Sequence, residues 1–212
     1  MAGSLHFGHR RWLMALVAAA LGLWTTSASA QLIDHVEEDW ELVVAEPYAA
    51  TNAPQVTCTM SPTSNEDGLH MTWEINHKSG AQYVGGGLTM QLWEGEGWLA
   101  TKRPVASTLM TTAETIRWTQ AMHIQGGNLV FEVKDGTSTT WGDFGDGSDK
   151  YKANAEYSGT LLGYSPDTSV ALSGIGFASN RVTSFVLKRV RIHLVGGAVI
   201  EDNTERVVFQ RD

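Results

Sequence analysis

Apolar and polar residues alternate with a period of two along most of the chain after Asp39. The clearest segments are 69–76, 88–93, 116–124 and 129–134. Such alternation is typical of half-buried antiparallel strands, because successive side chains point to opposite faces of a sheet. The side chains expected to point into the core are Leu69, Met71, Trp73, Ile75, Leu129, Phe131, Val133, Val190 and Ile192.

Further segments have the same pattern and are separated by turn residues. These additional strands are expected at 39–45, 54–60, 97–102, 157–163, 170–177, 181–195 and 205–210. Residues 105–114 are a modest candidate for a short helix. Eleven short strands without a strong helical pattern predict an all-β fold, namely a single antiparallel β-sandwich of jelly-roll type.

Across about residues 39–210, the number, length and alternation of the predicted strands resemble those of secreted jelly-roll sandwiches of the concanavalin-like or laminin-G-like kind. Many proteins of that architecture bind or cleave glycans. The resemblance implies a fold, and a fold alone does not carry a function with it.

The N-terminus is typical of a secretory signal peptide. Arg10 and Arg11 precede an apolar run over residues 12–24, and residues 28–30 form an Ala-Ser-Ala cleavage site. The run is shorter than the about 20 residues of an ordinary membrane span, and we expect no membrane insertion. The predicted organisation is a signal peptide at 1–30, an acidic lead-in at 31–38 and a sandwich domain at 39–212. The mature protein is expected to be secreted or periplasmic.

The charge balance argues against a nucleic-acid partner. Removal of residues 1–30 takes away two arginines and no acid, so 13 basic and 23 acidic side chains leave a net charge of −10. An acidic surface repels nucleic acid and anionic lipid. Cys58 is the one cysteine, so no intramolecular disulfide can form. Its alternation with Val56 and Met60 predicts a buried position, and a reactive thiol is the alternative.

The predicted strand at 181–195 carries a basic row, Arg189, Arg191 and His193. Such a row can bind a carboxylate, sulfate or uronate group through bidentate arginine contacts. Alternatively, it is a solvated sheet face neutralised by Glu74 or Glu132 on another strand.

The polar faces of the predicted strands together provide a candidate ligand-binding set suited to polyols, which need donors and acceptors. Because a sandwich has two outer faces, the set can be divided between them. It comprises His70, Glu74, Asn76, Gln91, Trp93, Arg117, His123, Glu132, Lys134, Arg189, Arg191 and His193.

Catalysis is the less favoured interpretation. Glu74 and Glu132 could act as a glycosidase pair only if they lie about 5–10 Å apart. Gln120, His123 and Gln125 lack the spacing and the tyrosine motif of jelly-roll polysaccharide lyases. Nucleophile-elbow, zinc-protease, P-loop and C-x-x-C motifs are also missing from the sequence.

Residues 137–151, TSTTWGDFGDGSDKY, raise the question of a metal site. Asp143, Asp146 and Asp149 do not have the spacing of an EF-hand. An irregular calcium site remains one interpretation, but we favour an Asx-rich turn in which glycines supply positive φ. Trp141 and Phe144 are expected to anchor this segment in the core.

These observations favour a secreted, non-catalytic carbohydrate-binding or surface-interaction module, whose partner is a glycan or another surface ligand. The alternatives are a structural component of an extracellular or surface assembly, and a polysaccharide hydrolase or lyase with a non-standard site. No cofactor is expected, with calcium at the three aspartates as the alternative.

Overall fold

Two antiparallel sheets account for most of the chain in the computed structural model, which describes residues 32–45, 54–76, 86–107, 109, 113–146 and 149–212. The larger sheet contains β1 (Ile33–Val44), β6 (Glu114–Gln125), β7 (Asn128–Ser138), β8 (Gly142–Phe144), β9 (Lys152–Glu156), β11 (Val182–Leu194), β12 (Val199–Asp202) and β13 (Arg206–Gln210). The smaller sheet contains β2 (Gln55–Met60), β3 (Leu69–Ile75), β4 (Leu88–Glu94), β5 (Gly97–Val105) and β10 (Gly174–Phe177).

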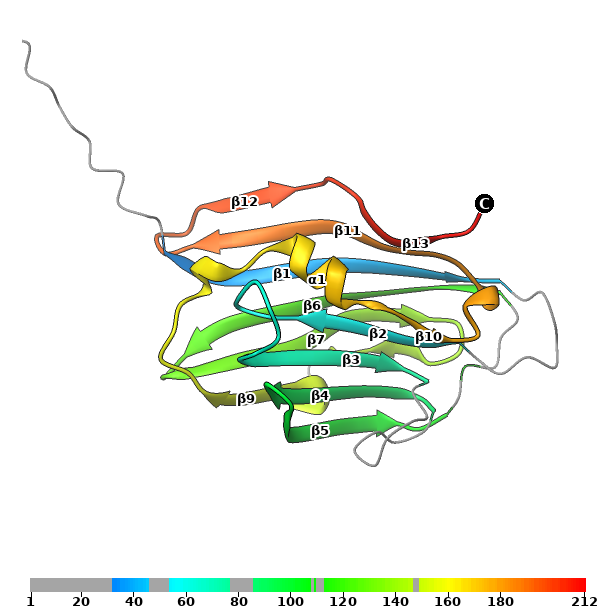
Figure 1. Cartoon of the computed structure of the whole chain (residues 1–212), viewed down its shortest axis with the longest axis horizontal. Coiled ribbons are helices and arrows are strands. Elements are labelled where there is room, and N and C mark those ends of the chain that lie inside the picture. Colours follow the sequence, from blue (N-terminus) through cyan, green and yellow to red (C-terminus); the bar gives the residue numbers. More distant parts are fainter. Residues whose placement is uncertain (1–31, 46–53, 77–85, 108, 110–112, 147–148) are drawn as a thin grey trace, which may run out of the picture. The chain divides into compact units, whose positions relative to one another are not determined.

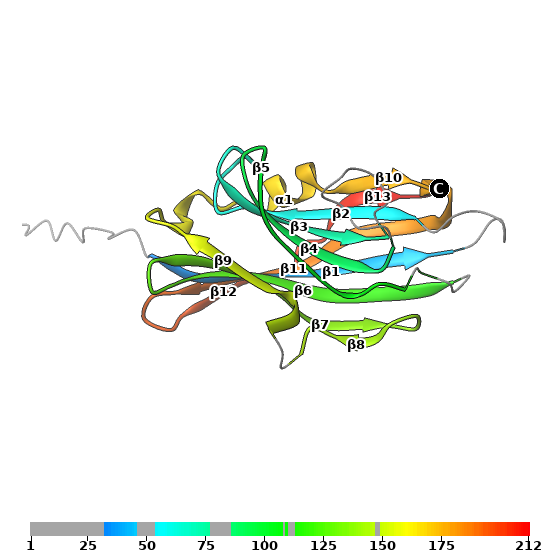
Figure 2. The same ribbon diagram turned by 90° about the horizontal axis from the view of Figure 1, so that it is seen from below.

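The eight-stranded sheet runs in the order β12-β11-β1-β6-β7-β8, with β13 paired to β11 and β9 paired to β7. The five-stranded sheet runs β10-β2-β3-β4-β5. Figure 1 shows the long strands β11, β1 and β6 side by side, and Figure 2 shows the two sheets as layers. The prediction of an all-β sandwich is therefore confirmed.

The core lies between the inward faces of the two sheets, as the period-two pattern predicts. Eight of the nine side chains expected inside are buried, and Ile192 is half-buried against the others. Trp40 and Trp118 stack with ring centroids 6.4 Å apart. Trp73 lies 5.9 Å from Phe144 in the same measure. Burial of large aromatic side chains dominates the stability of such a core.

Cys58 is buried in β2, as expected, and its thiol accepts a hydrogen bond from Gln120 Nε2 at 2.7 Å. Burial raises the pKa of this thiol well above its ordinary value. The group therefore stays protonated and packs as a small apolar side chain.

A short helix, α1 (Pro166–Leu172), lies beside β2 and β13 at one edge of the sandwich (Figure 1). Ser165 precedes it in an extended conformation and Pro166 occupies the first turn, where the missing N–H of proline costs nothing. Three 3₁₀ turns complete the described elements: η1 (Asp149–Tyr151), η2 (Leu161–Gly163) and η3 (Ser179–Arg181). In the described ranges, no helix has the length and apolar character needed to cross a membrane.

Several predicted boundaries are wrong. Residues 157–163 contain η2 and no strand, while 170–177 holds the end of α1 followed by β10. The strands β8, β9 and β12 were not expected. Of the helix candidate at 105–114, the described residues include the ends of β5 and β6 and no helix, and 108 and 110–112 lie outside them.

The acidic lead-in predicted at 31–38 is also wrong, because Ile33–Glu38 form the first half of β1. This strand is central in its sheet, paired with β11 on one side and with β6 on the other. Its carboxylates are compensated by basic residues on the neighbouring strands, so their charge does not keep the segment loose. The predicted signal peptide at 1–30 lies outside the described residues.

Candidate functional site

The outer face of the eight-stranded sheet carries a ladder of opposite charges. In β1, Glu37, Asp39 and Glu41 point outward, while Val36, Trp40 and Leu42 belong to the core. The register places Glu37 opposite Arg191 and Asp39 opposite Arg189 on β11. It also places Glu41 opposite Arg117 on β6. Opposite charges facing each other across strands stabilise the pairing.

Arg191 joins two of these carboxylates. Its Nε donates to Glu37 Oε2 at 2.6 Å, and its Nη1 and Nη2 donate to the two oxygens of Asp39 at 2.9 and 3.0 Å. Burial opposes ionisation of Glu37, but the hydrogen bonds from Lys134 and Arg191 outweigh it and lower its pKa to about 2. Glu37 is therefore a fixed negative charge at every ordinary pH.

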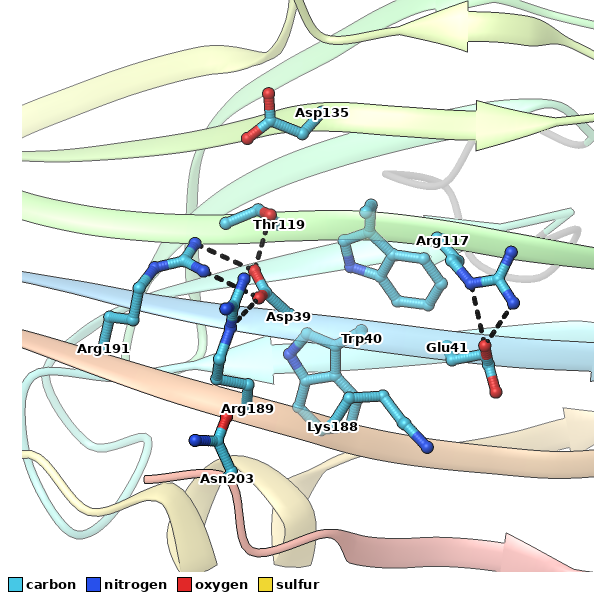
Figure 3. A pocket seen from close by; sticks show the side chains of 11 residues that line it. Asp39, Trp40, Glu41, Arg117, Thr119, Asp135, Lys188, Arg189, Arg191 and Asn203 are labelled. Carbon is cyan, nitrogen blue, oxygen red and sulfur yellow. Dashed lines mark hydrogen bonds and ion pairs between the residues drawn. The ribbon is translucent and has the colours of Figure 1, made fainter. Parts of the chain in front are cut away.

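An open groove runs along this ladder (Figure 3). We call it the outer groove. The outward side chains that line it are Asp39, Glu41, Arg117, Thr119, Asp135, Lys188, Arg189, Arg191 and Asn203. Trp40 and Trp118 also border it, but both are buried and point into the core. The outer groove therefore offers charges and amides and, among the residues that line it, no exposed aromatic face.

Asp39 lies at the centre of the outer groove, and both of its carboxylate oxygens accept hydrogen bonds (Figure 3). Besides the fork of Arg191, it accepts hydrogen bonds from Arg189 Nε at 2.7 Å and from Thr119 Oγ1 at 2.8 Å. It fixes the directions of both guanidinium groups. The groups that still face solvent are on the rim, where Arg117, Asp135 and Asn203 are exposed.

Three histidines lie in one row beside this ladder, and we call them the histidine row. His35 of β1 pairs with His193 of β11 on one side and with His123 of β6 on the other. The rings of His35 and His193 are stacked with centroids 4.9 Å apart, and the ring of His123 meets His35 edge-on at 5.5 Å.

The carboxylate of Glu37 lies next to the histidine row. His35 Nε2 is 3.7 Å from Glu37 Oε1, and His193 Nε2 is 3.5 Å from Glu37 Oε2. Burial lowers the pKa of His35 to about 4, although Glu37 acts in the opposite direction. His35 is therefore neutral at neutral pH, with a lone pair on one ring nitrogen.

The structure brings together seven of the twelve residues predicted from sequence. All of them lie on the outer face of the eight-stranded sheet. They are Arg117, His123, Glu132, Lys134, Arg189, Arg191 and His193. The basic row of β11 alternates as expected, but it is neutralised by Glu37 and Asp39, and not by Glu74 or Glu132.

Of the remaining five, Glu74, Gln91 and Trp93 are on the other sheet and are buried. Their face of β3 and β4 is covered, so this part of the prediction is wrong. Trp93 donates its Nε1–H to Thr72 Oγ1 at 3.2 Å and offers no open stacking surface. His70 and Asn76 of the same predicted set are buried with them.

The proposed glycosidase pair is also separated. Glu74 points away from the core on the five-stranded sheet, and Glu132 points away from it on the eight-stranded sheet. Two packed sheets are about 10 Å apart, and both side chains point outward from that distance. The two carboxyl groups therefore cannot flank a single bond.

The aspartates of residues 137–151 are only partly described. Asp143 is in β8, and Asp146 Oδ1 accepts a hydrogen bond from the backbone N–H of Asp135 at 2.9 Å. The side chain of Asp149 is outside the described part. The contact of Asp146 ties it to β7, eleven residues earlier in the chain, and is not the short-range contact of an Asx turn. The turn stays the prediction for this segment, with calcium binding as the alternative.

The same segment is anchored in the core by Phe144, as expected. Its ring is buried and lies over Gly136, where an added Cβ would be 2.1 Å from the ring. Trp141 is half-buried and donates its Nε1–H to the carbonyl oxygen of Ser107 at 2.8 Å.

Sequence reasoning did not include His35, Glu37, Asp39 or Glu41 in the candidate site. The signal was present, because these residues alternate with apolar positions from Val36 onward. The alternation is interrupted at Glu38, a carboxyl group that points into the core.

Glu38 is fully buried and accepts hydrogen bonds from Trp40 Nε1 at 3.0 Å and from Tyr164 Oη at 2.8 Å. Burial raises its pKa to about 7. A buried carboxyl group that is hydrogen-bonded in this way is compatible with a strand interior, which explains why the pattern continues through it.

Comparison with known proteins returned no relatives: the chain matches no protein-family model, no curated protein and no solved structure.

Proposed function

We propose that the chain is an exported, non-catalytic binding module with a jelly-roll sandwich, and that its outer groove holds a polyhydroxylated ligand such as a glycan. Sugar hydroxyl groups both donate and accept hydrogen bonds, so they suit a surface in which carboxylates, guanidinium groups and amides alternate. The outer groove has this alternation over β11, β1 and β6.

The observation that carries the proposal is that the guanidinium groups of the outer groove are already held in fixed positions before a ligand binds. Asp39 holds Arg189 and Arg191 in place by accepting three hydrogen bonds from their guanidinium nitrogens. Side chains that are already fixed lose little conformational entropy when a ligand binds, which favours affinity. Arg117, paired with Glu41 at 2.7 Å, extends the same arrangement toward the end of the groove.

The lining of the groove also indicates the kind of ligand. Because Trp40 and Trp118 are turned inward, the lining provides no aromatic ring on which a sugar can stack. Binding through hydrogen bonds alone favours a ligand that also carries charge, such as a uronate, which the exposed Arg117 can hold in a bidentate manner.

The experiment is a panel of neutral, uronate and sulfated oligosaccharides titrated into the protein, followed by variants. Arg117→Ala and Asn203→Ala are expected to weaken binding of the best ligand about tenfold, or about 1.4 kcal/mol each. Lys102→Ala serves as the control, because it removes one positive charge, as Arg117→Ala does, from an exposed position of β5 on the other sheet. Equal affinity in all variants, or no binding to any member of the panel, would contradict the proposal.

A separate observation favours a structural component of a surface assembly as the second candidate. β12 is the last strand at one end of the larger sheet, no described strand pairs with its outer edge, and Val199 and Ile200 on it are half exposed. An apolar edge strand is a template for pairing with another chain. Association that rises with protein concentration and is abolished by Ile200→Lys, without glycan binding, would favour this candidate.

A further inference from the structure

The histidine row contains two ring nitrogens that have no hydrogen-bond partner among the described residues. His35 Nε2 and His193 Nε2 are both buried, and neither has a hydrogen bond to any described residue. Buried polar atoms in folded proteins are nearly always paired, so an unpaired one calls for an explanation. Here two of them lie beside the same carboxylate, on neighbouring strands.

The ligand atoms are close together. One nitrogen from His35, one from His193 and one oxygen from Glu37 all lie within 4.8 Å of one another. In a tetrahedral site with bonds of about 2.0–2.1 Å, any two ligand atoms are about 3.3 Å apart. His35 Nε2 is 3.7 Å from Glu37 Oε1 and His193 Nε2 is 3.5 Å from Glu37 Oε2, so each nitrogen is close to that spacing from a different oxygen of the same carboxylate.

We infer that His35, His193 and Glu37 form a binding site for a divalent transition-metal ion of the Zn²⁺ or Cu²⁺ class. The three residues lie in adjacent strands, so the sheet holds their backbones in register. Coordination through Nε2 would satisfy both unpaired nitrogens, and it leaves each Nδ1 free to donate a hydrogen bond.

The ligand atoms of the site, two imidazole nitrogens and one carboxylate oxygen, determine which class of ion it suits. Glu37 already accepts hydrogen bonds from Lys134 and Arg191, so its negative charge is largely compensated. A carboxylate has about four acceptor positions, and the remaining ones can still coordinate. Calcium and magnesium require several oxygen ligands, whereas imidazole nitrogen suits zinc and copper.

The site does not depend on the proposed glycan function. It shares the outer face with the outer groove, but none of its three ligands lines that groove. The two functions can therefore be lost separately by mutation.

The test is a titration of the purified protein with Zn²⁺ alone, followed by calorimetry. We expect saturable binding at this site, weakened at least tenfold by His193→Gln and by His35→Gln. His70→Gln makes the same exchange on the five-stranded sheet and is expected to leave the titration unchanged. Absence of saturable binding at 100-fold excess of Zn²⁺, or binding that both variants leave intact, would overturn the inference.

A measurement on the unaltered protein guards against variants that fail to fold. Zn²⁺ is expected to shift the Nε2 resonances of His35 and His193 in ¹⁵N spectra of the imidazole rings and to leave those of His70 in place. Unchanged His35 and His193 resonances in the presence of saturating Zn²⁺ would contradict the assignment of these residues as ligands.

Discussion

Replacing Glu74 with glutamine is expected to stabilise the protein at high pH and to remove part of its pH dependence. The Glu74 carboxyl group is buried in β3, and only Oε2 has a described partner, Thr57 Oγ1 at 2.9 Å. Burial raises its pKa from 4.5 to about 8. Glutamine has nearly the same shape, keeps an oxygen for Thr57 and cannot ionise.

The direction of the effect follows from the raised pKa. The folded state retains the proton of Glu74 up to about pH 8, whereas the unfolded chain releases it near pH 4.5. The stability that results is fully present below about pH 4.5 and is lost as the pH rises through about 8. Each pH unit inside this interval lowers the free energy of unfolding by at most about 1.4 kcal/mol.

Between pH 5.5 and pH 7.5 the wild-type protein is therefore expected to lose up to roughly 3 kcal/mol relative to Glu74→Gln. For a domain of this size, that difference corresponds to about 6–12 °C in melting temperature. Other titrating groups, including Glu38, are present in both proteins, so their contributions cancel in the comparison.

The assay is urea unfolding of both proteins at several pH values across this range. Thr57→Val provides a further check, because loss of its hydrogen bond to the ionised carboxylate raises the pKa of Glu74 further and extends the loss to higher pH. A constant difference between wild type and Glu74→Gln from pH 5.5 to 7.5 would refute the assignment of Glu74 as a buried carboxyl group with a raised pKa.

Three further predictions concern packing, the thiol and calcium. Gly87→Ala is expected to lower the free energy of unfolding in urea by about 3 kcal/mol, because φ is +73° and the new Cβ would be 2.1 Å from a backbone oxygen. Gly126→Ala, which has open space around it, is expected to lower it by only about 1 kcal/mol. Cys58 is expected to resist a thiol reagent in the native protein and to react at once in urea; rapid native labelling would contradict its burial. The melting temperature is expected to be indifferent to millimolar calcium and to a chelator, and a calcium-dependent rise that Asp146→Asn reduces would show that the turn is a metal site.

The fold could be predicted where a strand has one apolar face and where turn residues next to it in the sequence mark its ends. Residues 69–75 alternate without a break, and residues 129–133 alternate except at Val130; both are strands with the expected faces inward. The failures fall where the local pattern is ambiguous. α1 has only seven residues, which is too short for helical periodicity to be distinguished from alternation, and β10 follows it almost directly.

The candidate site could be predicted only in part, because it depends on which strands are neighbours. The basic row of β11 was visible in the sequence, but its acidic partners on β1 are about 150 residues away. Burial of Glu74 and Gln91 was not visible, because alternation shows that two faces differ and does not show that the polar one is open to solvent. The position of a polar residue in a strand therefore predicts which face of the sheet its side chain points to, but it does not predict that this face is exposed to solvent.

The proposed ligand-binding role of the outer groove is tested most directly by mapping a ligand on the backbone amides. ¹⁵N–¹H correlation spectra would be recorded during titration with the best oligosaccharide of the panel. We expect the largest shifts on β11, β1 and β6 around Arg117, Thr119 and Arg189, with a smaller response on β3 and β4. Shifts confined to the five-stranded sheet, or no shifts at saturating concentrations of any oligosaccharide in the panel, would contradict it.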